Sequence, residues 1–183
     1  ITAQHREMLD QVLEIFEIKP DFDLNIMMPN QKIEDISSSI IEGVGKIIDQ
    51  FNPEIVLVHG DTTTTFSASF AAFCKQVSIG HVEAGLRTGN INSPWPEEAN
   101  RKLTSVLTNF HFAPTEVARK NLILENVDSK NIIVTGNTVI DSLKQTLLKI
   151  SLNESLTSQL KAKFDFLEEN SKLILVTGHR RES

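Results

Sequence analysis

Short apolar segments alternate with longer segments of helical periodicity, and this alternation restricts the fold more than any other feature of the chain. The apolar segments are four or five residues long, and helical patterns separate most of them. Short, nearly continuous apolar strands with helices between them are typical of a parallel sheet covered on both faces. The predicted strands are Ile55–Val58, Ser78–Val82, Phe110–Ala113, Ile132–Thr135 and Leu173–Thr177.

Helices are predicted where apolar residues recur every three or four positions. Because crossovers between parallel strands are right-handed, this order of elements predicts a Rossmann-like, doubly wound α/β domain. A further strand candidate is Leu24–Met28. The predicted helices are Gln4–Phe16, Ile33–Phe51, Thr62–Lys75, Glu97–Thr108, Glu116–Glu125, Thr138–Ile150 and Glu154–Phe166.

The end of the chain differs from this regular pattern. Between Asn137 and Ser171 two helical patterns follow each other with no strand between them, which predicts a bridge between two α/β domains. We therefore divide the chain into residues 1–136 and 137–183. The start at Ile1 and the buried type of strand close to the end indicate a piece of a longer protein.

Composition argues against several classes of protein. The 183 residues carry 18 basic and 24 acidic side chains, a net charge of −6, whereas a nucleic-acid-binding surface is basic. No apolar run reaches the roughly 18 residues of a membrane span, so we expect no membrane association and a cytoplasmic location. The single cysteine, Cys74, excludes an intramolecular disulfide, and its apolar neighbours predict a buried thiol.

Acidic residues follow the carboxyl ends of predicted strands, where open parallel sheets bind ligands. Asp61 comes just after the first of these strands, either as a helix N-cap or as a catalytic acid or base. Glu83 follows the next strand, and Glu97 and Glu98 begin a helix, where Glu98 is expected to interact with the helix dipole. Carboxylates gathered at one edge suit general acid–base chemistry.

Basic and hydroxyl groups are predicted at the same edge. His179, Arg180 and Arg181 follow the last predicted strand, and Arg87 lies in the loop after Ser78–Val82. Such a cluster suits a diphosphate by charge and by bidentate geometry, with a solvated loop as the alternative. The segment Thr62–Thr65 offers hydroxyls and helix N-terminal amides to an anion, without the spacing of a P-loop.

Two histidines leave a metal site as an alternative. His59 and His81 each precede an acidic residue by two positions, and neighbouring loops could bring these pairs together as metal ligands. The other interpretation is that both imidazoles pack beside glycine. The second half of a zinc deaminase motif is absent, which excludes that class.

Six segments together resemble the bacterial non-hydrolysing UDP-N-acetylglucosamine 2-epimerases. The resemblance implies the N-terminal part of a GT-B fold, in which two Rossmann-like domains enclose the active site. It also implies a homodimeric isomerase that interconverts UDP-GlcNAc and UDP-ManNAc without a metal or a cofactor. The matching segments are Thr2–Arg6, Val58–Thr65, Gly80–Thr88, Ser93–Arg101, Thr135–Asp141 and Val176–Glu182.

The resemblance assigns roles to individual residues. It implies that Asp61, Glu83 and Glu97 are the acid–base carboxylates and that His179 assists the departure of UDP. The reaction would proceed by elimination of UDP to a 2-acetamidoglucal and re-addition of UDP, and we expect the 183 residues alone to be inactive. Substrate-binding roles are expected for Gln4, Thr62, Arg87 and Arg180.

Other functions share some of these features. A GT-B glycosyltransferase would use the same nucleotide but transfer the sugar to an acceptor. A non-catalytic domain could oligomerise through the apolar helix Ile33–Phe51. Some family members are activated by a second UDP-GlcNAc through a pattern that includes Gln4, but Glu7 and Asn30 depart from that pattern, so we expect no obligate activation.

Overall fold

The computed structural model describes residues 1–3, 6–28, 31–167 and 172–176. The chain separates into two compact units, Ile1–Thr138 and Val139–Ser183. The first unit carries the sheet and most of the candidate site. Gln4, His179, Arg180 and Arg181 lie outside the described residues, so their expected roles stay predictions.

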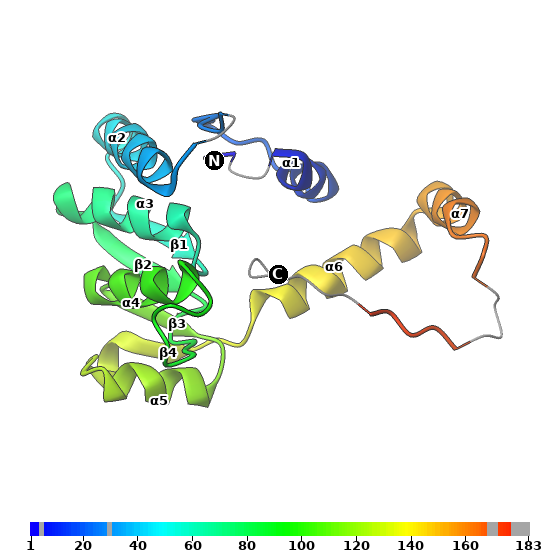
Figure 1. Ribbon diagram of the computed structural model, residues 1–183. Helices are drawn as coiled ribbons and strands as arrows, with labels where there is room; N and C mark the ends of the chain where they lie inside the picture. The colour runs from blue at the N-terminus through cyan, green and yellow to red at the C-terminus, as the bar shows by residue number, and fades with distance from the viewer. Residues whose placement is uncertain (4–5, 29–30, 168–171, 177–183) are drawn as a thin grey trace. The chain divides into compact units, whose positions relative to one another are not determined.

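Four parallel strands form the sheet of the first unit in the order β1-β2-β3-β4 (Figure 1). Each strand pairs with the next along the chain, so the carboxyl ends of all four lie at one edge. The strands are β1 (Ile55–His59), β2 (Ser78–Val82), β3 (Phe110–Ala113) and β4 (Ile132–Val134). The predicted parallel α/β sheet is therefore confirmed.

Three helices connect these strands, and right-handed crossovers between successive neighbours place them on the same face of the sheet (Figure 1). They are α3 (Thr63–Cys74), α4 (Glu97–Leu107) and α5 (Glu116–Leu124). A fourth helix, α2 (Ile33–Phe51), packs against α3. The remaining elements are α1 (Arg6–Ile15), a 3₁₀ turn at Ser129–Asn131, α6 (Thr138–Leu152) and α7 (Glu154–Lys163).

The core lies between the sheet and these helices. Val58 and Ile79 pack against Ala68 and Ala72 of α3, whose small side chains let the helix approach the sheet closely. The apolar face of α2 completes this cluster through Ile36, Ile40 and Ile48. The apolar residues of α2 that were considered as an oligomerisation surface thus lie largely in the core of this chain.

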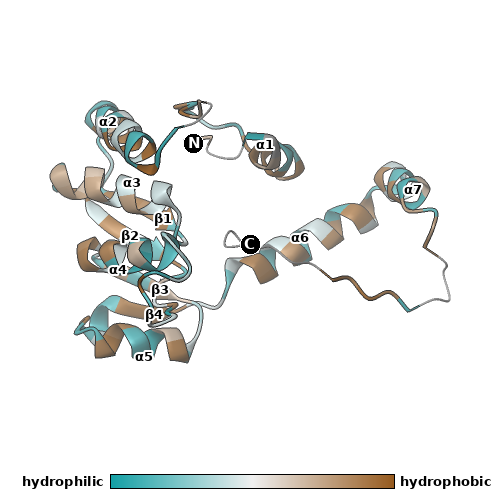
Figure 2. Cartoon of the chain, in the orientation of Figure 1, coloured by the Kyte–Doolittle hydropathy of each residue, from teal (hydrophilic) through white to brown (hydrophobic). Residues whose placement is uncertain are grey.

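The opposite face of the sheet has no such cover among the described residues. Side chains on this face alternate with the buried ones along each strand. Ile55, Leu57, Phe110 and Ile133 are 39–62% exposed there. In the second unit, Figure 2 shows apolar residues along α6, of which Val139, Leu143 and Leu147 are more than half exposed.

Three expectations about local structure are wrong. Leu24–Met28 forms no strand, although its backbone donates two hydrogen bonds to residues 1 and 2. Residues 172–176 form no strand either, because no described segment pairs with them, and Thr177 lies outside the described residues. Cys74 is exposed, since it ends α3 while Ala68, Ala71 and Ala72 form the buried face of that helix.

Gly85 is the point of closest approach between the loop after β2 and α5. Its φ is +87°, and a Cβ there would lie 2.3 Å from the Ala118 carbonyl oxygen. We expect Gly85→Ala to lower the free energy of unfolding by about 3 kcal/mol, through backbone strain and overpacking together. Gly89 is a matched control, since its φ is +79° with nothing within 4 Å of a Cβ.

Urea unfolding of the two variants separates these contributions. Gly89→Ala should lose only the strain component, about 1 kcal/mol. Equal losses at the two positions would contradict the importance of the contact with α5.

Candidate functional site

Two acidic residues come together at the carboxyl edge of the sheet. Asp61 and Glu83 lie in the loops after β1 and β2, which are joined by a hydrogen bond from the Gly60 amide to the Val82 carbonyl at 3.0 Å. Glu83 Oε1 lies 3.8 Å from the place that a Cβ on Gly60 would occupy. The Glu83 carboxylate therefore sits beside the residue that precedes Asp61.

The environment of Asp61 excludes one of its two interpretations. The N-cap of α3 is Thr62, whose hydroxyl accepts from the Thr65 amide at 3.3 Å. The Asp61 carboxylate instead pairs with the guanidinium of Arg101 on α4. The N-cap interpretation of Asp61 is thus wrong, because the hydroxyl of the next residue already fills that role.

The helix α4 holds Asp61 through two consecutive residues. Asn100 donates its side-chain amide to the Asp61 carbonyl at 2.9 Å, and Arg101 binds the carboxylate. Arg101 also lies 3.4 Å from Glu98, which accepts a 3.3 Å hydrogen bond from the Gly89 amide. Glu98 lies in the first turn of α4, where the sequence predicted an interaction with the helix dipole. It is completely buried, and the structure adds Arg101 and the Gly89 amide as its partners.

Glu97 lies on the face of α4 that approaches Asp61. It is the first residue of the helix and precedes Arg101 by four positions. Residues spaced by four lie on one helix face. Because Arg101 contacts Asp61, this spacing places half-buried Glu97 on the same side of α4 as the Asp61 loop.

Glu83 has a strained backbone and a side-chain partner. Its φ is +69°, in the left-handed region, which costs roughly 1–2 kcal/mol for a residue with a Cβ. Asn137, which follows β4, donates to Glu83 Oε2 at 3.4 Å. Six other described non-glycine residues also have positive φ, so it is the contact with Asn137 rather than this conformation that distinguishes Glu83.

The guanidinium of Arg87 is not an exposed cation at this edge of the sheet. Its side chain is 7% exposed and pairs with Glu125 at 2.7 Å. Its other hydrogen bonds go to the Leu86 carbonyl and to Ser105 of α4. The hydrogen bond from Arg87 lowers the pKa of Glu125 below its usual value. Arg87 thus ties the loop after β2 to α4 and to the end of α5.

The histidines differ in their surroundings. His81 is fully buried, and its Nε2 lies 2.7 Å from the Gly60 carbonyl, which fits packing beside glycine. His59 is exposed, with Nε2 3.3 Å from the Thr138 hydroxyl.

Within the described part of the chain, no three His, Cys, Asp or Glu side chains group as metal ligands. No described helix is long and apolar enough to cross a membrane.

Four residues with clear positions were not predicted for this site. They support the acidic residues through hydrogen bonds or ion pairs, and the spacing of four between Glu97 and Arg101 was the one available signal in the sequence. Glu98 also lies within one helical turn of Arg101, whereas the contacts of Asn100 and Asn137 join residues far apart in the chain. The four are Arg101, Asn100, Asn137 and Glu98.

Known proteins match this chain in sequence and in structure. A family model described as UDP-N-acetylglucosamine 2-epimerase matches residues 1–183. The UDP-N-acetylglucosamine 2-epimerases of Neisseria meningitidis and Escherichia coli K12 are 57% and 56% identical over the whole chain. The chain spans about half the length of these curated relatives, 49% of each.

Solved structures of UDP-N-acetylglucosamine 2-epimerases also match this chain. The crystal structure of the Neisseria meningitidis enzyme bound to UDP-GlcNAc matches with a TM-score of 0.94 and 58% identity, over 100% of this chain and 49% of that one. The Methanocaldococcus jannaschii enzyme in complex with UDP-GlcNAc and UDP matches with a TM-score of 0.80 and 32% identity, over 88% of this chain and 44% of that one.

Fold and site together define a Rossmann-like α/β domain that forms the N-terminal part of a GT-B fold and gathers acidic side chains at its carboxyl edge. More specifically, the chain belongs to the UDP-N-acetylglucosamine 2-epimerase family, whose members are isomerases.

Proposed function

We propose that the complete protein containing this chain interconverts UDP-GlcNAc and UDP-ManNAc by inverting C2 of the sugar. The proposal is supported by the position of Asp61 and Glu83 on neighbouring loops at the carboxyl edge, with Glu97 on the helix that contacts Asp61, in a chain that the family model matches over its whole length. The ligands named for the matched structures, UDP-GlcNAc and UDP, support the substrate.

The low acidity of the proton on C2 of the sugar determines the route of the reaction. The C2 proton is not acidic, so its removal is coupled to departure of UDP. One carboxylate takes the proton from C2, the C1–O bond breaks, and a C1–C2 double bond forms in 2-acetamidoglucal. UDP then adds back to C1 while an acid delivers a proton to the opposite face of C2. This sequence needs acid–base groups on both faces of the sugar.

Three carboxylates meet that requirement in the proposal. Asp61, Glu83 and Glu97 share the two proton transfers, and His179 assists the departing diphosphate. Arg180, Thr62 and Gln4 bind substrate. Arg87, whose donors bind Glu125, Ser105 and Leu86, contributes by holding the loop that carries Glu83.

The 183 residues alone are proposed to be inactive, since they span 49% of the length of the matched relatives. A homodimer, a cytoplasmic location and the absence of obligate activation by a second UDP-GlcNAc remain predictions for the complete protein.

Proton exchange in D₂O tests the proposal. The complete protein and this chain are each incubated with UDP-GlcNAc, and C2 is followed by NMR. We expect deuterium at C2 and formation of UDP-ManNAc only with the complete protein. An unexchanged C2 proton in spite of UDP-GlcNAc binding would contradict the epimerase reaction. It would favour a GT-B glycosyltransferase, whose reaction leaves the C2–H bond intact.

A further inference from the structure

We propose that Arg101 is a positioning residue that sets the direction of the Asp61 carboxylate, with Glu98 as the fixed support behind it. The proposal rests on the catalytic role of Asp61 in the proposed epimerase reaction.

One guanidinium joins the two carboxylates. Its Nη2 pairs with Asp61 Oδ2, and its Nη1 lies 3.4 Å from Glu98 Oε2. The Arg101 side chain is 15% exposed, that of Asp61 is 22% exposed, and Glu98 is fully buried. A guanidinium is a rigid planar fork, so two partners fix both its position and its orientation. Buried Glu98 therefore restricts where Arg101 can hold Asp61.

The support from Glu98 is itself anchored. Glu98 Oε1 accepts a hydrogen bond from the Gly89 amide at 3.3 Å, so its carboxylate has one partner on each side. A buried carboxylate has no access to water that could replace these partners. The chain of contacts thus runs from the loop after β2 through Glu98 and Arg101 to Asp61.

The main chain of Asp61 is held by the same helix. Asn100 binds the Asp61 carbonyl at 2.9 Å, one residue before Arg101. Both the backbone and the carboxylate of Asp61 are therefore attached to α4, whose first residue is Glu97. A rigid helix that holds one acidic group and carries another keeps the two in a constant geometry, which proton transfer at C2 requires.

Arg101→Met and Arg101→Lys in the complete protein test this role. We expect kcat to fall about 10²-fold in Arg101→Met, because small misplacements of a reacting group have effects of this size. KM for UDP-GlcNAc should change much less. Lysine restores charge but has a single ammonium in place of the fork, so rescue should be partial.

The neighbouring residue provides a matched control. Lys102 also belongs to α4 and loses the same charge in Lys102→Met, but its side chain is 42% exposed and its partner is Glu125. Its kcat should stay within about twofold of the parent, as expected for an exposed ion pair. An equal fall in both variants would overturn a specific role for Arg101.

A double-mutant cycle separates positioning from support of the fold. If Arg101 acts through Asp61, then adding Arg101→Met to Asp61→Asn should lower kcat little further. A full multiplicative loss, or a rise in KM that exceeds the fall in kcat, would overturn the proposal. Arg101→Met leaves the buried carboxylate of Glu98 without its cation, which could prevent folding. In that case Glu98→Gln is added to Arg101→Met to remove the buried charge, and this double variant replaces Arg101→Met in the same cycle.

The parent protein distinguishes this proposal from the proposed function. If the parent exchanges the C2 proton and the cycle is multiplicative, only the positioning role fails. If the parent does not exchange that proton, both proposals fail together.

Discussion

Asp61→Asn in the complete protein is expected to lower kcat at least about 10²-fold, the usual size of a lost acid–base group. Asparagine has nearly the same shape, and its amide oxygen still accepts a hydrogen bond from Arg101. What it loses is the ability to exchange a proton with C2 of the sugar. The fall should therefore appear in C2 deuterium exchange and in UDP-ManNAc formation alike.

Asp49→Asn is the control for this change. Asp49 pairs with Lys75 at 2.5 Å and its side chain is 59% exposed, so turnover should stay within about twofold of the parent. Thermal unfolding of both variants shows whether the loss of charge beside Arg101 affects the fold. Near-normal turnover of folded Asp61→Asn would remove Asp61 from the mechanism and leave Glu83 and Glu97 as the acid–base pair.

The same reasoning applies to two other positions. Glu97→Gln and His179→Asn should each lower kcat by at least about 10²-fold. Glu42→Gln is the control for the glutamate, since Glu42 is exposed on α2 and pairs with Lys46 one turn further along the helix.

The sheet and its helices could be predicted from the sequence because each element carries its own period. The strands Ile55–Val58 and Ser78–Val82 were found to within one residue, since a buried strand is apolar along its whole length. The predicted strand near the end failed for a different reason. An apolar run forms a strand only beside another strand, and the run itself does not show whether one is present.

The position of Asp61 and Glu83 at the carboxyl edge could also be predicted, but their partners could not, and their catalytic roles stay predictions. Asp61 and Glu83 were found because carboxyl ends of parallel strands meet at one edge. The partner of Asp61 lies forty positions further along the chain, and that of Glu83 lies fifty-four positions further. Such contacts depend on how α4 and the segment after β4 pack, which no local pattern encodes. The ion pair of Arg87 with Glu125 was not predicted for the same reason, since the two residues are 38 positions apart.

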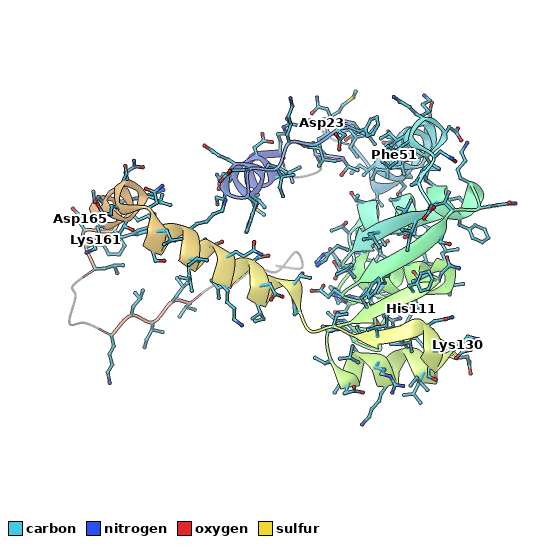
Figure 3. The ribbon with its side chains drawn as sticks, turned by 180° about the vertical axis from the view of Figure 1, so that it is seen from behind. Asp23, Phe51, His111, Lys130, Lys161 and Asp165 are labelled. Carbon is cyan, nitrogen blue, oxygen red and sulfur yellow. The ribbon has the colours of Figure 1, made fainter. Side chains whose placement is uncertain are left out.

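Two buried histidines are expected to make the fold sensitive to acid. His81 and His111 are register partners on β2 and β3, and each has an Nδ1 with no hydrogen-bond partner among the described residues. Figure 3 labels His111 on the sheet. Burial is the main reason that the pKa of each falls from 6.5 to about 4. Repulsion from Arg87 contributes in both cases, and His81 also disfavours a charge on His111.

The sign of the effect follows from proton binding. Between pH 6.5 and about 4 the unfolded chain binds protons that the folded chain excludes, so stability is complete above pH 6.5 and decreases as the pH falls toward 4. A fall in pKa from 6.5 to about 4 corresponds to about 3 kcal/mol of unfolding free energy for each histidine. Together the pair should remove several kcal/mol, a large part of the stability of a domain.

Urea unfolding of this chain at a series of pH values measures the effect. The histidines dominate the upper part of this range, because the carboxyls whose pKa values are lowered by neighbouring cations lose their contribution mainly as the pH falls through 4.5 and below; they include Glu125, Asp128, Asp23 and Glu42. A His81→Asn, His111→Asn double variant should lose most of the slope in this upper part, even if it is less stable throughout. An unchanged slope would show that other groups take up the protons. A flat profile in the parent would show that the two imidazoles take up protons in the folded protein as readily as in the unfolded chain.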